Sequence, residues 1–366
     1  MSKRIQFSKT GGAEVLEWVE VEPAAPAAGE VRIANKAVGL NFIDIYFRTG
    51  LYPAPAMPSG LGTEGAGTVD AVGEGVTHLK VGDRVAYAQG PLGAYAELHT
   101  LPAAKVVKLP DFIDFDTAAA SMLKGLTVQY LLRQTYALKG GETILFHAAA
   151  GGVGSIACQW AKALGVKLIG TVSSKEKADL AMANGAWATI DYTKENVVER
   201  VRELTQGEMC DVVYDSVGKD TWEMSLDCLK PRSLMVSFGN ASGPVDGVNI
   251  GILNQKGALF VTRPSLNGYA DTRERLEIMC DEFFGMIESG KIHIDVANRY
   301  PLQEAGKAQD ALQSRKNDGF YDSVAVIPTR YRHLLDIDIS TQLTHSALKT
   351  GHVVDQLVRA ECHALR

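Results

Sequence analysis

A glycine-rich segment, Ala148–Gly154 with the sequence AAAGGVG, carries the clearest chemical signal in the chain. It follows an apolar stretch typical of a strand and precedes Ser155–Leu164, whose apolar residues recur at helical spacing. Glycines between a strand and a helix permit a tight turn, let backbone N–H groups approach a phosphate, and allow close helix–strand packing. The N-terminus of such a helix also presents unpaired N–H donors and the positive end of its dipole. The segment therefore predicts a dinucleotide site; the alternative is a purely structural glycine turn. The residues expected at the pyrophosphate are Gly151, Gly152, Val153 and Gly154.

The end of the next strand decides which nicotinamide cofactor such a site would hold. An NAD site places Asp or Glu there, roughly 20 residues past the glycines, to bond the ribose 2′-hydroxyl. Here the strand-like stretch Val166–Val172 is followed by Ser173–Lys177, with the sequence SSKEK and no carboxylate at the strand end. Two hydroxyls and two ammonium groups suit a 2′-phosphate, so we expect NADPH, bound by Ser173, Ser174 and Lys177. The alternative is an ordinary serine N-cap followed by a charged first helical turn.

Two kinds of sequence pattern divide the chain. Before Asp116, short apolar stretches bounded by Gly, Pro or Asp are typical of an irregular all-β domain. They are Glu30–Val38, Gly67–Val72 and Arg84–Tyr87. From Asp116 onward, apolar strands alternate with amphipathic helices, which predicts a parallel sheet covered by helices. The strands are expected at Thr143–Ala148, Val166–Val172, Ala188–Asp191, Asp211–Val217, Ser233–Phe238 and Ala258–Thr262, and the helices at Ser155–Leu164, Lys175–Asn184, Asn196–Leu204, Thr221–Leu229 and Thr272–Ser289. A last strand-like stretch, Ser323–Ile327, can return to the first domain.

Composition and charge narrow the class of protein. The 366 residues suit two domains, and the net charge of −6 argues against a standing role on nucleic acid or acidic membranes. There is no apolar run of about 18 residues and no signal-peptide core near the N-terminus, so we expect a cytoplasmic protein. The five cysteines never form a CxxC pair, which predicts reduced thiols. The segment 329–366 has no glycine-punctuated βα unit, and we expect it to be a tail outside the fold.

Seven motifs together are far more specific than the glycine turn alone. They are Gly39–Tyr46 (GLNFIDIY), Arg48–Pro53 (RTGLYP), Gly60–Gly67 (GLGTEGAG), Lys124–Thr127 (KGLT), Phe146–Gly154, Tyr214–Gly218 (YDSVG) and Ser237–Asn240 (SFGN). With them, the sequence resembles the medium-chain dehydrogenase/reductase superfamily from about Arg4 to Pro328. Within it, the chain is similar to the zinc-free NADPH:quinone oxidoreductases related to zeta-crystallin, and to the bacterial quinone oxidoreductases among them.

The resemblance implies an α/β fold, in which a Rossmann-type parallel-sheet domain accompanies a GroES-like β-barrel catalytic domain. The expected limits are 1–125 for the barrel domain, completed by about 266–328, and 126–265 for the NADPH-binding domain. The resemblance also implies a homodimer formed by edge strands of the nucleotide domain. Here Ala258–Thr262 is the candidate strand, because an exposed apolar edge tends to be covered or paired.

Two positions bear on whether the chain holds zinc. In the zinc alcohol dehydrogenase branch, a cysteine ligand falls at the position matching Asn41 and a histidine ligand at the position matching Thr63. The structural zinc lobe of that branch has four cysteines, whereas Gln89–Leu101 contains none. Zinc needs three or four N, S or O protein ligands, so we expect no metal site.

The resemblance assigns roles by motif match. Tyr46 and Tyr52 would border a pocket shared by the nicotinamide and a quinone, with Asn41 as a polar group in the vacated metal position. The other residues implied at the cofactor are Phe42, Thr127, Tyr130, Ser173, Ser174, Lys177, Tyr192, Ser216, Phe238, Gly239, Asn240 and Arg263, in addition to the glycine turn. The alternatives are tyrosines that pack in the barrel with surface hydroxyls, and Asn41 as a plain turn residue. Glu64 is expected to be structural, and a contact of Arg315 with the cofactor stays open.

A site without zinc constrains the chemistry. Hydride transfer to a simple ketone builds charge on oxygen and normally needs a Lewis acid or a strong proton donor. Quinones and conjugated enones spread that charge over a π system, so the sequence predicts metal-independent reduction of quinones by NADPH. It leaves open whether a hydride or single electrons are transferred. The alternatives are an NADPH-dependent 2-enal, 2-enone or enoyl-thioester reductase and, in a different class, a single-stranded RNA-binding or structural crystallin-like protein. The negative net charge and the lack of an arginine-rich aromatic platform disfavour RNA.

Overall fold

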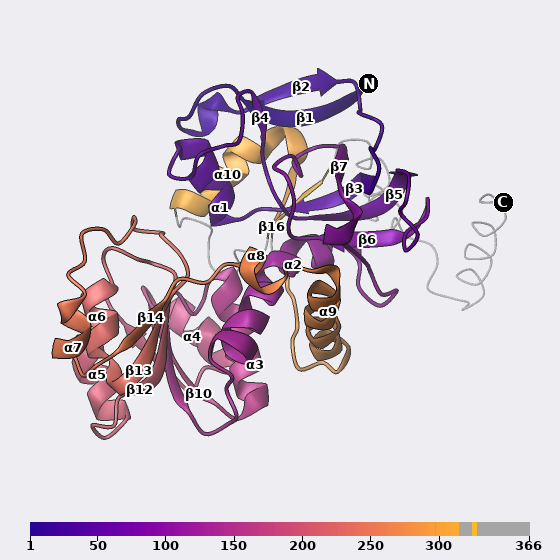
Figure 1. The fold of residues 1–366 in the computed structure, drawn as a ribbon. Helices are drawn as coiled ribbons and strands as arrows, with labels where there is room; N and C mark the ends of the chain where they lie inside the picture. Colours follow the sequence, from indigo (N-terminus) through magenta and orange to yellow (C-terminus); the bar gives the residue numbers. More distant parts are fainter. Residues whose placement is uncertain (297, 315–323, 328–366) are drawn as a thin grey trace, which may run out of the picture. The chain divides into compact units, whose positions relative to one another are not determined.

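A six-stranded parallel sheet forms one half of the chain (Figure 1). The computed structural model describes residues 1–296, 298–314 and 324–327. The strand order is β11-β10-β9-β12-β13-β14, which is the 3-2-1-4-5-6 order of a Rossmann fold. The strands are β9 (Thr143–Phe146), β10 (Lys167–Val172), β11 (Ala188–Asp191), β12 (Cys210–Asp215), β13 (Leu229–Ser237) and β14 (Phe260–Thr262).

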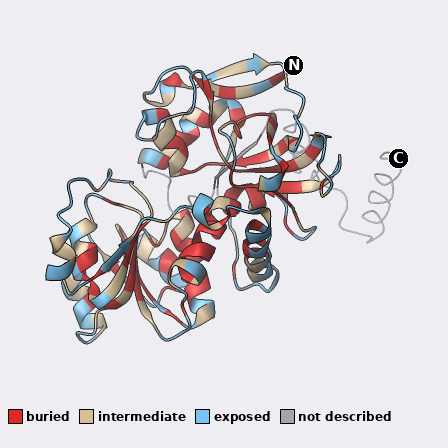
Figure 2. Cartoon of the chain, in the orientation of Figure 1, coloured by how far each residue is buried: buried red, intermediate tan, exposed pale blue. Residues whose placement is uncertain are grey.

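Helices cover both faces of this sheet, because alternate residues of each strand point to opposite sides. On β9, Ile144 and Phe146 pack in one core with α3, whereas Leu145 packs in a second core with α5 and α6. Both cores consist of buried residues, and Figure 2 shows the buried positions of the strands in red. The helices of this half are α3 (Gly152–Leu164), α4 (Lys175–Ala183), α5 (Val197–Leu204), α6 (Trp222–Asp227) and α7 (Gly251–Gln255).

The other half is built on antiparallel pairing. A seven-stranded sheet has the order β15-β16-β3-β5-β6-β8, and β7 also pairs with β3. A small sheet of β2, β1 and β4 lies beside it. The strands are β1 (Ser2–Phe7), β2 (Glu17–Val21), β3 (Glu30–Gly39), β4 (Ser59–Gly60), β5 (Gly65–Val72), β6 (Arg84–Tyr87), β7 (Leu98–Pro102), β8 (Val106–Lys108), β15 (Asn298–Pro301) and β16 (Val324–Ile327). Because β16 pairs antiparallel with β3, the end of the described chain lies in the N-terminal sheet.

One long helix, α2 (Phe115–Tyr130), joins the two halves. Its N-cap Asp114 accepts a hydrogen bond from Thr117 N at 2.7 Å, and almost every residue after its first turn is buried. It packs against β3 and β5 on one side and against α3 and α9 (Arg273–Glu288) on the other. A domain limit at residue 125 therefore falls inside a continuous helix. Three further helices are α1 (Phe42–Thr49), α8 (Leu266–Tyr269) and α10 (Ala305–Ser314).

The predicted alternation of strands and helices is confirmed, with ends that differ by a few residues. The largest differences are at α3, which begins at Gly152 rather than Ser155, and at β13, which begins at Leu229 rather than Ser233. Four of the cysteines, Cys158, Cys210, Cys228 and Cys280, are buried free thiols. None of the helices among the described residues is long and apolar enough to cross a membrane. The tail 329–366 and Arg315 lie outside the described residues.

Candidate cofactor and substrate site

The glycine turn connects the end of β9 to the start of α3. Gly151 is the N-cap of α3 at φ −76°, which any residue can adopt, so it needs no left-handed backbone. The left-handed position of the turn is Ala148, at φ 54°. Gly154 is required by space, since a Cβ there would lie 2.4 Å from the Ala148 carbonyl oxygen. The turn thus brings α3 close to β9, as the third glycine of the motif predicts. The first N–H groups of an α-helix have no partner within the helix.

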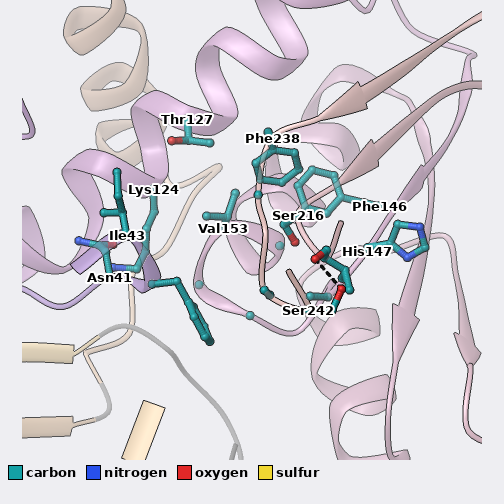
Figure 3. Close-up of a pocket in the computed structure, with 18 of the residues that line it drawn as sticks. Asn41, Ile43, Lys124, Thr127, Phe146, His147, Val153, Ser216, Phe238 and Ser242 are labelled. Atoms are coloured by element: carbon teal, nitrogen blue, oxygen red, sulfur yellow. Dashed lines mark hydrogen bonds between the residues drawn. The ribbon is translucent and has the colours of Figure 1, made fainter. Parts of the chain in front are cut away.

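A cavity of about 1350 Å³ begins at this turn and extends to helix α1. It lies where the strand order reverses between β9 and β12, the usual ligand position in open parallel sheets. The predicted site residues that line it are Asn41, Phe42, Tyr46, Tyr52, Thr127, Tyr130, Gly151, Gly152, Val153, Gly154, Ser173, Lys177, Tyr192, Ser216, Phe238, Gly239 and Arg263. Figure 3 shows Asn41, Ile43 and Lys124 on one side of the pocket and Phe146, Ser216 and Phe238 on the other, with Val153 between them.

One end of the cavity is polar and basic. Lys177 Nζ lies 3.3 Å from Ser173 Oγ, and both side chains line the cavity just past the end of β10. Tyr192, which also lines the cavity, is 44% exposed. Ser174 differs from the prediction: it does not line the cavity, and its hydroxyl accepts a hydrogen bond from Lys177 N as the N-cap of α4. Ser174 therefore has the capping role that the sequence left open, while Ser173 and Lys177 form a pair of donors suited to a phosphate.

At the other end, two tyrosine hydroxyls bond across the cavity. Tyr46 Oη accepts a hydrogen bond from Asn240 N at 3.3 Å, and Arg263 Nη2 donates to Tyr52 Oη at 3.2 Å. The Asn240 side chain is 3.1 Å from Tyr52 Oη, although Asn240 itself is not among the residues that line the cavity. Burial raises the pKa of Tyr46, so its hydroxyl stays protonated. The tyrosine hydroxyls are thus inside the site rather than at the surface.

Asn41 is the N-cap of α1, and its side chain belongs to a buried polar cluster. Asn41 Nδ2 donates to Glu64 Oε2 at 2.7 Å, and Leu123 N donates to Glu64 Oε1 at 2.6 Å. Burial raises the pKa of Glu64, whereas the Lys124 charge opposes that rise. A Cβ on Gly39 would lie 2.2 Å from Glu64 Oε2, so glycine is needed for this carboxylate to fit. The positions support a structural role for Glu64 and a cavity-lining role for Asn41.

Aromatic rings form the middle of the cavity. The Tyr130 ring stacks on Tyr269 with centroids 4.8 Å apart, and the Phe238 ring lies 5.7 Å from that of Phe146. His147 also lines the cavity, but its two ring nitrogens lie 3.0 Å from Thr171 Oγ1 and 2.9 Å from Ser225 Oγ. Burial lowers the pKa of His147, so this histidine is a neutral structural group.

Several polar residues that the sequence analysis did not assign to the site also line the cavity, among them Gln89, Lys124 and Asn267. Gln89 Nε2 donates to Asn267 Oδ1 at 2.9 Å, which ties the loop after β6 to α8. Lys124 belongs to a motif that the sequence did single out, but its direction into the cavity depends on the fold. Within residues 1–296, 298–314 and 324–327, no three His, Cys, Asp or Glu side chains converge as a metal site would require.

Comparison with known proteins relates both halves to known families. The model described as alcohol dehydrogenase GroES-like domain matches residues 27–111, and the one described as zinc-binding dehydrogenase matches residues 152–279. A quinone oxidoreductase of Pseudomonas aeruginosa is 68% identical over 319 residues, which cover 87% of this chain and 98% of that protein. A 2-haloacrylate reductase of a Burkholderia species is 42% identical, over 87% of this chain and 97% of its own length. The crystal structure of Escherichia coli quinone oxidoreductase complexed with NADPH superposes with a TM-score of 0.87 at 59% identity, covering 89% of this chain and 100% of that one.

Proposed function

The chain belongs to the zinc-free quinone oxidoreductases of the medium-chain dehydrogenase/reductase superfamily, and we propose that it reduces quinones with NADPH without a metal ion. The observation that carries the proposal is the single cavity that links the Ser173–Lys177 pair to Tyr46 and Tyr52. One end suits a phosphate and the other suits a planar acceptor with two oxygens. The NADPH-bound E. coli relative supports the choice of cofactor.

The residues present fit NADPH along the length of the cavity. Ser173 and Lys177 would hold the 2′-phosphate, and the N-terminus of α3 would hold the pyrophosphate through backbone N–H groups. Ser216, Phe238 and Thr127 would flank the ribose and nicotinamide. Bound there, NADPH supplies a hydride from C4 of its nicotinamide.

The chain's own groups would orient the acceptor and exclude water. The Tyr46 hydroxyl accepts from Asn240 N, so its proton is free to bond a quinone oxygen. Tyr52 is held by Arg263, which places a fixed positive charge near the same end of the cavity. Because a quinone spreads incoming charge over its ring, these donors can stabilise it without a Lewis acid.

Steady-state kinetics with three acceptors tests the proposal. We expect NADPH with a naphthoquinone to turn over fastest, NADH to be poor, and a chelator to have no effect. The resemblance to a 2-haloacrylate reductase makes a conjugated enone the second candidate, with enoyl-CoA as the third arm. Faster turnover with the enone, or activity abolished by the chelator, would contradict the proposal.

We also propose that the protein is a homodimer in the cytoplasm. For its domains we propose the limits 1–125, completed by about 266–328, for the barrel domain and 126–265 for the NADPH-binding domain. The edge strand β14 exposes Phe260 (62%) and Val261 (37%), and in the described part of the chain it pairs on one side only, with β13. An apolar edge of this kind is suited to pairing with a second copy. Light scattering should give twice the 39.4 kDa of one chain, and a monomer mass would refute the dimer.

A further inference from the structure

Lys124 is a buried lysine that the assigned roles leave unused. Its side chain is 5% exposed and extends from α2 into the cavity on the side of Asn41 (Figure 3). Nζ donates to the Leu40 carbonyl oxygen at 3.3 Å and lies 3.9 Å from Glu64 Oε2, beyond hydrogen-bond length. An ammonium has three donors, and only one of them has a hydrogen-bond partner among the described residues. Lys124 therefore has N–H capacity to spare at the wall of the acceptor site.

The proposed reaction lacks a source for one proton. A quinone that gains a hydride becomes a hydroquinone with one oxygen still anionic, so a second hydrogen must arrive as a proton. The Tyr46 hydroxyl is a poor acid here, because burial raises its pKa. Lys124 has N–H donors without a hydrogen-bond partner among the described residues at the wall of the cavity, so its ammonium group is placed to supply a proton.

We propose that the Lys124 ammonium donates the proton that completes the reduction of the quinone. The inference rests on the proposed function. One Nζ–H bond breaks and one O–H bond forms on the anionic oxygen, while the two electrons have come with the hydride. The neutral amine then regains a proton from water, so each turnover consumes one quinone, one NADPH and one proton.

The charged groups around Lys124 fit this role. Glu64 and Asp44 are the carboxyl groups whose charge interacts with Lys124, and both are fully buried. When Lys124 is neutral, Glu64 still accepts hydrogen bonds from Asn41 Nδ2 and Leu123 N. The carboxylate is therefore not stranded without partners after the proton leaves.

Quinones that differ in their need for a proton provide the first readout. A tetrachlorinated benzoquinone gives a strongly acidic hydroquinone that can leave as the anion, whereas a methylated benzoquinone needs protonation. In K124M, kcat should fall on the order of 100-fold with the methylated quinone and far less with the chlorinated one. The matched control is K105M, because Lys105 Nζ also donates to a carbonyl oxygen, that of Ala270 at 2.8 Å, but does not line the cavity. K105M should leave both rates unchanged.

Binding of 4-nitrophenol, followed by its absorbance, provides a readout that does not depend on turnover. Next to an ammonium, the bound phenol should ionise at a lower pH than in water, and K124M should abolish this shift. K124R covers the case in which K124M does not fold, because guanidinium keeps the charge but does not release its proton. We expect K124R to retain the nitrophenol shift and to lose turnover of the methylated quinone.

Equal losses with both quinones in K124M, or wild-type rates with the methylated one, would overturn the proposal. So would a nitrophenol shift that survives in K124M. If the wild-type protein reduces no quinone with NADPH, the proposed function fails, and the nitrophenol titration still decides whether Lys124 faces a phenolic oxygen.

Discussion

Replacing Asp44 by asparagine should change how the stability of the protein depends on pH. Asp44 is fully buried; its Oδ2 accepts hydrogen bonds from Asn41 N and Tyr95 Oη, both at 2.9 Å, and its Oδ1 has no partner. Burial raises the pKa of this carboxyl from 3.8 to about 7. In D44N, the amide oxygen can accept the same two hydrogen bonds, and the NH2 group takes the place of the unpartnered oxygen.

The sign follows from proton binding. Between pH 4 and 7 the folded protein holds a proton on Asp44 that the unfolded chain has released, so raising the pH favours unfolding. At about 1.4 kcal/mol per pH unit, the interval from 3.8 to about 7 corresponds to a loss of roughly 4 kcal/mol in the wild type. D44N has no such proton to lose. From pH 3.8 to about 7, the free energy of unfolding of D44N minus that of the wild type should therefore increase by roughly 4 kcal/mol.

Urea unfolding of both proteins at several pH values, at one protein concentration, measures the difference. The control is D111N, whose carboxyl is exposed to solvent apart from a contact with Arg84, and which should follow the wild-type curve. Parallel curves for D44N and wild type would refute the reasoning, because they would mean that Asp44 binds no extra proton in the folded state.

Three further substitutions test the site and the helix that joins the two halves. Lys177→Ala should weaken NADPH binding by roughly 1.5–3 kcal/mol and leave NADH binding unchanged. The control Lys175→Ala loses only an exposed ion pair and should change the binding of neither cofactor. Equal losses for both cofactors in a binding titration would refute the phosphate role of Lys177. Tyr52→Phe removes a hydroxyl that contacts Arg263 and Asn240 and that would bond the quinone. The kcat/KM for the quinone should therefore fall by the equivalent of about 0.5–1.5 kcal/mol while NADPH affinity stays, and an unchanged kcat/KM would count against this hydroxyl. Gly125→Ala would place a Cβ 2.2 Å from the buried Phe283 ring and should lower the free energy of unfolding by about 1–3 kcal/mol, as followed by thermal unfolding. An unchanged melting curve would show that the ring moves freely.

The parts of the fold that sequence predicts best are those set by local pattern. The βα units were predictable because each strand is a short apolar run and each helix has an apolar face, as in Lys167–Val172 followed by Lys175–Ala183. The start of β13 was less predictable, because Pro231 lies inside a strand that begins at Leu229. The short α1 depends on its N-cap at Asn41 and on burial of Ile45, and a motif alone does not show it to be a helix.

The same distinction holds for the site. Gly154, Ser173 and Lys177 lie within the stretch of consecutive elements β9, α3, β10 and α4, so their spacing already places them together. For Ser174 the sequence left two roles open, a phosphate ligand and an N-cap, and in the structure its hydroxyl caps α4. The contact of Glu64 with Lys124 joins segments about sixty residues apart, and only the packing of α2 on β3 and β5 brings them together.

We propose that this cavity lets NADPH reduce a quinone without a metal ion. The most direct measurement is a single turnover under anaerobic conditions, in which metal-stripped protein loaded with NADPH is mixed with a naphthoquinone in a stopped-flow instrument. We predict complete loss of the nicotinamide absorbance in one phase, slowed when the transferred C4 hydrogen is deuterium and unaffected by added zinc. If NADPH is not oxidised until zinc is supplied, metal-independent reduction of the quinone is contradicted.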